Sequence, residues 1–259
     1  MDEFYNFDLC NIQDSNQSNN IKRFSGIFIH LAAARSDRQS LEEYKKNNIE
    51  ATAKILELLD PNKIKIIVHI SSVAAIDGRI LEAKDSTLFN SDDWYRYTKF
   101  IQEKIIKNWS ELHNVKLLIL APSAIYTPQS RNDTNIGRLQ KLSKFLPIIP
   151  SINIKKSLTN MEIFLKEITD HIEEKQTIGN KPKMRIVIDK PVLTVSSHME
   201  GIKGKKFMKL YIPFLKEFLM SLAYIIEILR LENFIPLTKN RVIKLFKDTS
   251  YSEQRIYLD

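Results

Sequence analysis

Residues 63–70 read Lys-Ile-Lys-Ile-Ile-Val-His-Ile and are followed directly by Ser71-Ser72. Apolar and mostly β-branched side chains at nearly every position predict a strand that is buried on both faces. Apolar runs of the same kind occur at 27–31 and 115–120. Strands buried on both faces are typical of parallel sheets covered by helices. The stretch 63–70 and its two counterparts therefore indicate a parallel sheet.

Helical patterns separate these expected strands. One helix is expected over 40–61, where Ser40 and Glu43 form a capping box before a series of apolar residues. A second is expected over 94–112. The segments expected as loops are 15–20 and 73–93. Strands alternating with helices predict an α/β fold with a Rossmann-like, doubly wound parallel sheet, in which ligands bind at the carboxyl ends of the strands.

The alternation weakens after residue 125, where Pro128, Pro147 and Pro150 interrupt the chain. Helices are still expected over 160–174 and 214–231, with a short strand over 184–188. We therefore expect a nucleotide-binding core with the catalytic residues over 1–125. A smaller, mainly substrate-binding lobe is expected over 126–259, with segments that return to the core.

Composition narrows the class of protein. The 259 residues are 43% hydrophobic, enough for a full core. A single cysteine, Cys10, cannot form an internal disulfide, and Asp2 and Glu3 stand where a signal peptide needs basic residues, so we expect a cytoplasmic protein. The net charge of +8 is spread along the chain without an aromatic-interleaved stripe, so no nucleic-acid partner is expected.

The apolar segment 214–231 resembles a membrane segment only in part. Its uncharged run over 218–226 falls short of the ~20 residues that span a bilayer, so no transmembrane segment is expected. A helix that packs against the rest of the lobe is favoured. Lysines shortly before it, from Lys203 to Lys209, leave a membrane-surface helix as the alternative.

Tyr95 and Lys99 are the residues that point most clearly to chemistry. They are four apart on an expected helix and so share one face. A phenol is a poor base at neutral pH, but a neighbouring ammonium favours its phenolate. Ser72, at the end of the preceding strand, offers a hydroxyl to the same substrate oxygen. A Tyr-x-x-x-Lys pair usually marks a solvated helix face, but here a Ser-Ser strand end precedes it and a Pro-Ser strand end follows, which favours a site for proton and hydride transfer.

Several stretches in this order resemble the extended short-chain dehydrogenase/reductase family, the NAD-dependent sugar-nucleotide epimerases and dehydratases. Three resemble the family's cofactor-side motifs: an acidic-apolar pair, a His-x-Ala-Ala strand end and an Asn-x-x-Gly-Thr motif with alanine for glycine. Two more resemble a Pro-x-x-x-Tyr segment near the nicotinamide and a basic-Ser-Leu segment near the substrate diphosphate. These stretches are Asp8-Leu9, His30–Ala33, Asn48–Thr52, Pro122–Tyr126 and Lys156–Leu158, beside Ser71-Ser72 and Tyr95…Lys99.

The resemblance implies roles for individual residues. The catalytic residues would be Ser72, Tyr95 and Lys99. The residues that bind NAD, or NADP, would be Asp8, Leu9, Leu31, Ala32, Ala33, Asn48, Lys99, Pro122 and Ser123. The residues that bind the nucleotide-sugar substrate would be Ser72, Tyr126, Arg131 and Lys156. No metal is expected, since His113, His171 and His198 lack the spacing of metal ligands.

The implied activity is oxidoreduction at C4 of a nucleotide sugar, a UDP-sugar for surface polysaccharide, by an enzyme that could form a homodimer. One family feature is missing: no Gly-x-x-Gly-x-x-Gly occurs among the six glycines. That loop brings the backbone close to the pyrophosphate of the cofactor. We therefore expect the sheet to be incomplete at its N-terminal side and cofactor binding to be impaired. The alternative is a truncated, inactive family member or gene fragment that acts, if at all, through binding.

Overall fold

The structure is a computed structural model that describes residues 15–34, 40–84, 89–127, 130, 134–145, 148–173, 182–203, 208–231, 237–251 and 255–257. Asp8, Leu9 and Arg131 lie outside these residues. The chain divides into two compact units. Unit 1 comprises 1–123, 162–187 and 252–259, and unit 2 comprises 124–161 and 188–251.

Unit 1 is built on a five-stranded sheet with the order β1-β2-β3-β8-β11. Neighbours among the first four strands pair in parallel and β11 is antiparallel to β8. The strands are β1 (Gly26–His30), β2 (Ile64–Ile70), β3 (Lys116–Pro122), β8 (Lys183–Val187) and β11 (Arg255–Tyr257). The three predicted strands β1, β2 and β3 are confirmed and stand side by side. Burial on both faces holds for β2 and β3, whereas Ile29 of β1, at the edge of the described sheet, is 39% exposed.

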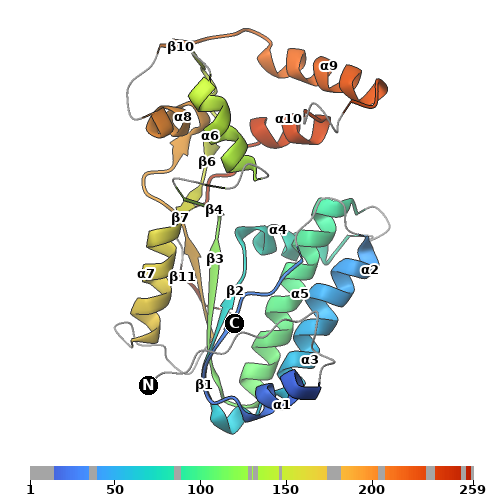
Figure 1. Ribbon diagram of the computed structural model, residues 1–259, viewed down its shortest axis with the longest axis vertical. Coiled ribbons are helices and arrows are strands. Elements are labelled where there is room, and N and C mark those ends of the chain that lie inside the picture. Colours follow the sequence, from blue (N-terminus) through green and yellow to red (C-terminus); the bar gives the residue numbers. More distant parts are fainter. Residues whose placement is uncertain are drawn as a thin grey trace. The chain divides into compact units, whose positions relative to one another are not determined.

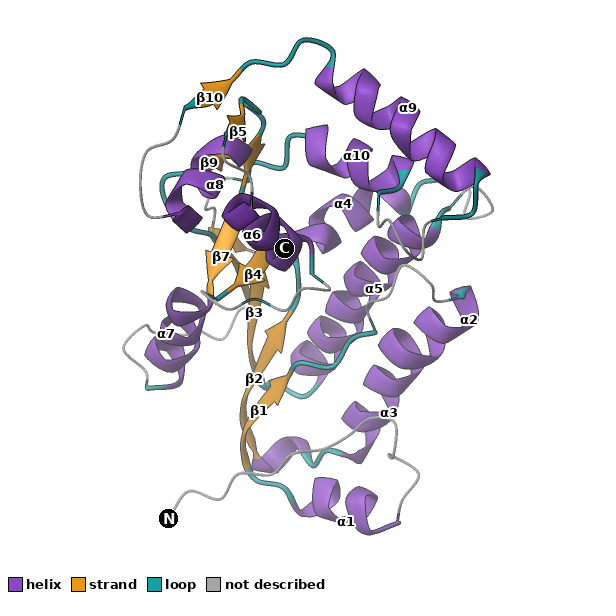
Figure 2. Cartoon of the chain, turned by 45° about the horizontal axis from the view of Figure 1, so that its top comes forward, coloured by secondary structure: helices purple, strands orange, loops and turns teal. Residues whose placement is uncertain are grey.

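Helices cover both faces of this sheet. Figure 1 shows α3 (Ala51–Leu58) and α5 (Ser91–Leu112) on one side and α7 (Met161–Ile172) on the other. Figure 2 shows the same two layers from another direction. Full burial of Ile67, Ile119 and Leu120 in the central strands follows from this double cover. The predicted α/β, Rossmann-like parallel sheet is confirmed.

The helix expected over 40–61 consists of consecutive segments. Its capping box is present: the Ser40 hydroxyl accepts from Glu43 N, and the Glu43 carboxylate accepts from Ser40 N at 2.7 Å. The segments are α2 (Leu41–Tyr44), a π-helical stretch (Lys45–Glu50) and α3. π-Helical turns are rare and concentrate at functional sites. This one contains the buried Asn48.

Two segments predicted as loops are helices. α1 (Ser15–Arg23) is polar in sequence, but its Ile21 is completely buried and anchors it. α4 (Val73–Leu81) begins where the Ser72 hydroxyl accepts a hydrogen bond from Ala74 N. A glycine in its middle, Gly78, concealed it from a prediction based on helix propensity. Tertiary packing against α5 stabilises α4 despite that glycine.

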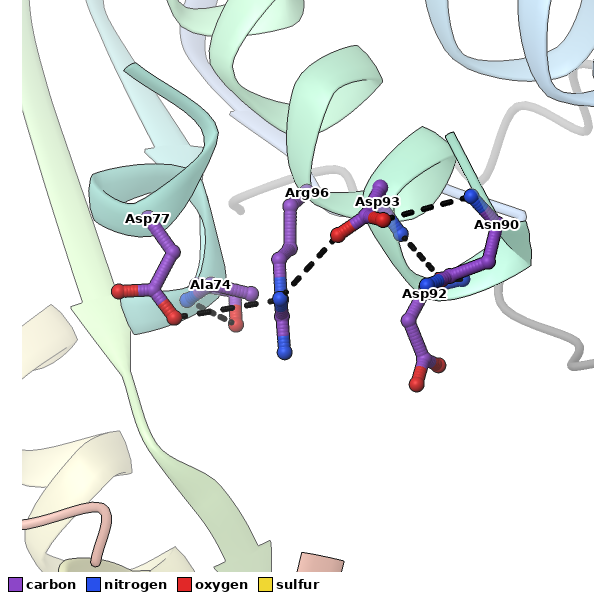
Figure 3. A network of polar contacts seen from close by, with 7 residues as sticks. Ala74, Asp77, Asn90, Asp92, Asp93 and Arg96 are labelled. Atoms are coloured by element: carbon purple, nitrogen blue, oxygen red, sulfur yellow. Dashed lines mark hydrogen bonds and ion pairs between the residues drawn. The ribbon is translucent and has the colours of Figure 1, made fainter. Parts of the chain in front are cut away.

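α5 begins at Ser91, three residues earlier than predicted, because Asn90 caps it. The Asn90 side chain accepts from the backbone N–H of Asp92 and of Asp93. Figure 3 shows Arg96 of α5 extended between Asp93 of its own helix, at 3.4 Å, and Asp77 of α4, at 3.9 Å. The cap and the arginine fix the first turns of α5 beside α4, and these turns carry Tyr95 and Lys99.

Gly78 is the point of closest approach between α4 and α5. A Cβ atom added there would lie 2.2 Å from the carbonyl oxygen of Arg96 and 3.0 Å from Phe100 Cβ. Because the first contact is with backbone, the two helices would have to separate. We expect Gly78→Ala to lower the free energy of unfolding by about 2–3 kcal/mol, measured by urea denaturation.

The matched control for this prediction is Gly201→Ala in α8 (Val195–Lys203), where an added Cβ would meet no atom within 4 Å. Replacing a helical glycine by alanine is ordinarily stabilising by roughly 0.5–1 kcal/mol. Equal free energies of unfolding for Gly78→Ala and the wild type would contradict the close approach of α4 and α5.

Unit 2 consists of short strand pairs and four helices among its described residues. β4 (Ala124–Tyr126) pairs in parallel with β7 (Leu158–Asn160). The other pairs are β5 (Ile149–Pro150) with β10 (Lys209–Leu210) and β6 (Lys155–Lys156) with β9 (Leu193–Thr194). The helices are α6 (Asn135–Phe145), α8, α9 (Leu215–Ile228) and α10 (Lys239–Phe246). Ile149, Ile152, Val195 and Met199 form a small core.

α9 packs with only one of its faces. Ala223 and Ile226 are buried, whereas Phe218 and Ile225 are 63% and 51% exposed. The expectation of a packing helix therefore holds for its inner face alone. None of the described helices is long and apolar enough to cross a membrane.

Candidate active site

The Ser71-Ser72 pair directly follows β2. The first serine is buried in the core, and the second is half-buried. Ser71 is 6% exposed and donates to Glu103 Oε1 at 2.5 Å. Ser72 caps α4, because its hydroxyl oxygen accepts a hydrogen bond from Ala74 N at 3.2 Å. That contact leaves the hydroxyl hydrogen of Ser72 available to a substrate oxygen. Ser72 rather than Ser71 is thus the serine suited to contact a ligand.

Lys99 is buried within unit 1. It is 2% exposed, and its Nζ donates to Ile70 O at 3.1 Å and to Gln102 Oε1 at 2.6 Å. Burial lowers its pKa to about 8, against the opposing effect of the Glu103 carboxylate. Lys99 therefore carries its charge at neutral pH. Ile70 is the last residue of β2, so the ammonium group lies at the carboxyl end of that strand, next to Ser71-Ser72.

Tyr95 lies one helical turn before Lys99 on α5 and is half-buried. Its ring packs near that of the buried Tyr44, with centroids 6.3 Å apart. Tyr97, the other phenol of this stretch, instead packs edge-on against Phe89 and Trp94. The two tyrosines therefore have different neighbours.

Two buried polar residues of α5 were missed from the sequence. Gln102 is fully buried and accepts from Lys99 Nζ, and Glu103 is 3% exposed. Burial raises the pKa of Glu103, while the Ser71 hydroxyl and Arg79, 3.6 Å away, oppose that rise. Their positions three and four residues after Lys99, on the same helix face, could have indicated from the sequence that they lie close to the lysine.

The segment after β1 holds the small residues predicted to lie beside the cofactor. Leu31 is 64% exposed, and the three alanines that follow are half-buried. Asn48 is completely buried and clamps this segment: its Oδ1 accepts from Ala34 N at 2.6 Å and its Nδ2 donates to Thr98 Oγ1 at 3.1 Å. The structure therefore places Asn48 behind the segment, where it holds the backbone.

Pro122 and Ser123, at the end of β3, are both buried. Pro122 stands opposite Val187 of β8, and Ser123 N donates to Val187 O at 3.4 Å. Through the adjacent carboxyl ends of β1, β2 and β3, the sheet brings together Leu31–Ala33, Ser72, Lys99 and Pro122. These residues belong to one edge of unit 1.

The remaining predicted residues belong to unit 2. The Tyr126 hydroxyl donates to Asp189 Oδ2 at 2.8 Å, and burial together with that carboxylate raises the pKa of Tyr126. Lys156 Nζ donates to the carbonyls of Lys244 and Lys247 at the end of α10. Burial lowers the pKa of Lys156 to about 8, opposed by Asp248. A cation at a helix C-terminus is stabilising, so Lys156 has a structural task.

A pair of histidines lies behind the site in the core. His30 Nδ1 and His69 Nδ1 are 3.1 Å apart, and both side chains are at least 98% shielded from solvent. Thr52 Oγ1 donates to Asn48 O at 2.7 Å, so it can only accept from His30 Nε2, at 3.4 Å. His30 Nδ1 then accepts a hydrogen bond from the Nδ1–H group of His69. His69 Nε2 is left as an acceptor without a partner among the described residues.

This pair is expected to make the fold acid-labile. Burial, and then the charge of Lys99, lower the pKa of His30 to about 3 and that of His69 well below 6.5. Because the unfolded chain binds these protons near pH 6.5, stability is full above that pH and falls as the pH drops toward the folded pKa. For His30 alone the expected loss at about pH 5 is ~2 kcal/mol.

Urea denaturation between neutral pH and about pH 5 measures this loss. In His30→Phe, which removes one of the two titrating groups, the fall should be shallower than in the wild type. Free energies of unfolding that do not change over this range in the wild type would contradict the neutral, buried pair.

The edge of unit 1 fits the nicotinamide half of a dinucleotide. Among the described residues Lys99 Nζ has two acceptors, and since an ammonium has three N–H groups, one remains for a ribose hydroxyl. The small side chains of Ala32 and Ala33 allow a flat ring to approach the backbone. The described residues include no group of three or more His, Cys, Asp or Glu placed to hold a metal ion.

The sequence profile of the NAD dependent epimerase/dehydratase family matches residues 2–146, more than half of the chain. The chain belongs to this family. The match includes β1, β2, β3, Ser72, Tyr95 and Lys99, so the family's enzymatic class applies to the part of the chain that carries the candidate site. The comparison with curated proteins gave no match.

Solved structures similar to this family member share its fold. UDP-glucuronic acid 4-epimerase from Bacillus cereus in complex with NAD is 20% identical, with a TM-score of 0.58 over 82% of this chain and 68% of that one. UDP-N-acetylglucosamine 4-epimerase from Methanobrevibacter ruminantium is 18% identical, with a TM-score of 0.56 over 78% and 68%. The terminal R domain of the myxalamid pathway is 16% identical, with a TM-score of 0.64 over 98% and 65%.

Proposed function

We propose that this chain is an NAD-dependent enzyme that oxidises a nucleotide sugar at C4, as a step of epimerisation, dehydration or reduction. The observation that carries the proposal is the buried, charged Lys99, held at the end of β2 one turn after the half-buried Tyr95. The same strand end presents the hydroxyl of Ser72. A phenol, a cation and a hydroxyl at the carboxyl edge of a parallel sheet suit proton removal from an alcohol.

Each side chain has a defined task in this proposal. Tyr95, as phenolate, takes the proton of the sugar hydroxyl, and Ser72 donates its hydroxyl hydrogen to the same sugar oxygen. Lys99 places a positive charge one helical turn from Tyr95 and offers its remaining N–H to the cofactor ribose. The cofactor, when bound, accepts the hydride from the sugar carbon. Leu31, Ala32, Ala33, Pro122 and Ser123 would line its nicotinamide, and Asn48 would hold that lining in place.

Unit 2 would bind the rest of the substrate. The proposed contacts of the sugar and diphosphate are Tyr126, Arg131 and Lys156. Among the described residues two of the three N–H groups of Lys156 donate to carbonyls at the end of α10, and the third would contact the substrate. The epimerases that share the fold are UDP-glucuronic acid and UDP-N-acetylglucosamine 4-epimerases. They support a UDP-sugar as substrate, for which surface polysaccharide synthesis in the cytoplasm is the proposed setting.

The test is turnover of sugar nucleotides by the full chain. It is incubated with NAD and, separately, UDP-glucose, UDP-glucuronic acid or UDP-N-acetylglucosamine, and the sugars are examined by proton NMR. Conversion of at least one sugar that depends on added NAD supports the proposal. Calorimetric titration with NAD accompanies it. Absence of both NAD binding and conversion would overturn the proposal in favour of an inactive family member.

A further inference from the structure

Gln102 of α5, which has no part in the proposed reaction, contacts several segments of the candidate site. It is completely buried, and its amide makes hydrogen bonds to groups from four segments of unit 1. Oε1 accepts from Lys99 Nζ at 2.6 Å. The two N–H groups of Nε2 are shared among three acceptors, Ala32 O at 3.0 Å, Asn48 O at 3.1 Å and Thr52 Oγ1 at 2.8 Å.

These partners allow only one orientation of the amide. An ammonium is a donor without acceptor capacity, so Oε1 must face Lys99. The two backbone carbonyls are acceptors, and Thr52 has already given its hydrogen to Asn48 O, so all three require a donor. The flipped amide would place NH₂ against NH₃⁺ and a carbonyl oxygen against two carbonyls. Burial makes such a mismatch costly.

The amide therefore joins the two parts of the site that must meet a substrate and a cofactor together. On one side is the nitrogen of Lys99, whose place at the end of β2 depends on Ile70 O and Gln102 Oε1. On the other side is the backbone of Ala32, in the small-residue segment after β1. Asn48, clamped to Ala34, is the third element tied to the same amide.

We propose that Gln102 is a positioning residue, whose amide fixes Lys99 Nζ relative to the Ala32 backbone and holds the lysine as an acceptor-bound ammonium. The proposal rests on the proposed function for its catalytic consequence, but the position and charge of Lys99 can be measured without turnover. Because the pKa of Lys99 is lowered mainly by burial, a neutral acceptor at 2.6 Å favours its charged form.

Gln102→Met keeps the length of the side chain and removes the acceptor. The ammonium then loses a hydrogen bond, so the pKa of Lys99 should fall below its wild-type value. Gln102→Glu keeps the acceptor at Oε1 and adds a negative charge, so it should raise that pKa above the wild-type value. Its second oxygen would face Ala32 O and Asn48 O, and this mismatch should appear as a loss of thermal stability. Opposite shifts in the two variants distinguish positioning from simple loss of packing, which moves stability alone.

The measurement is carbon NMR of full-length chain labelled at lysine Cε, titrated between about pH 6 and 11, with the Lys99 signal identified by its loss in Lys99→Met. Gln140→Met is the matched control. Gln140 is likewise a buried glutamine, in α6 of unit 2, donating to Thr127 O and accepting from Ser130 N. Thermal unfolding of all variants gives the structural cost, and the Lys99 titration should be unchanged in Gln140→Met.

If NAD-dependent turnover is found, Gln102→Met should lower kcat about tenfold and shift the alkaline limb of its pH profile to lower pH, with KM for the sugar little changed. Gln102→Glu should shift that limb to higher pH. Lys99 titrations that coincide in the wild type and in both variants would overturn the role of Gln102. Shifted titrations in a chain without turnover would leave that role intact and contradict only the proposed function.

Discussion

Tyr95→Phe is expected to lower kcat for NAD-dependent conversion of a UDP-sugar by about 10³-fold, within the range of general acid–base catalysis. The substitution removes one oxygen atom and keeps the ring that packs near Tyr44. The free energy of unfolding should therefore change little, as measured by urea denaturation. The sugar nucleotide should still bind, because the proposed contacts of its diphosphate are with other residues.

Tyr97→Phe is the control for this variant. It lies two residues away on the same helix and loses the same atom, but its ring belongs to the aromatic cluster with Phe89 and Trp94. Its turnover should stay within about twofold of the wild type. Equal losses in the two variants would show that the phenol at 95 has no special part in the reaction.

Lys99→Met is expected to lower kcat by about 10²–10³-fold, because the positive charge at the proposed site of proton transfer is lost. In the wild type, activity should fall as the pH rises through about 8, where the folded-state lysine loses its proton. The variant should lack that alkaline limb. The pH dependence of kcat, measured for both proteins between about pH 6 and 10, provides the comparison.

The control for the loss of charge is Lys104→Met, on the same helix. Lys104 is exposed, 2.6 Å from Glu82 and 5.5 Å from the centre of the Phe100 ring. An exposed ion pair contributes little to stability, so both turnover and the pH profile should be those of the wild type. An alkaline limb that persists in Lys99→Met would assign it to another group.

The fold could be predicted because its central strands are unambiguous. Runs such as Ile64–Ile70 have apolar side chains on both faces, and their alternation with helices indicates a parallel sheet covered on both sides. α4 could not be predicted in the same way. Gly78 lowers its helix propensity, and only contact with Arg96 and Phe100 of α5, distant in sequence, shows why a glycine stands there.

The candidate site likewise has features that could be predicted from local sequence and features that could not. The Tyr95–Lys99 spacing and the Ser72 strand end are local patterns, and the structure places Lys99 Nζ and Ser72 at the carboxyl end of β2. What surrounds Lys99 depends on residues far apart in sequence. Gln102 lies 70 residues from Ala32 and 54 from Asn48, and no local pattern in the chain indicates that one amide connects them. The role of Lys156 at the end of α10 was hidden for the same reason.

The central claim is that the residues around Tyr95 and Lys99 serve hydride removal from C4 of a nucleotide sugar. UDP-sugars that carry deuterium at C4 test it most directly. Each is mixed with excess enzyme and NAD, the mixture is quenched rapidly with alkali, in which the reduced cofactor is stable, and the cofactor and the sugar are analysed by mass spectrometry. For at least one sugar we expect deuterium in the recovered cofactor, and none in Tyr95→Phe. Because an epimerase returns the deuteride to C4, the cofactor is sampled before equilibrium is reached. A sugar that is converted without labelled cofactor at any time point, and whose C4-deuterated form is converted as fast as its protiated form, would contradict the claim.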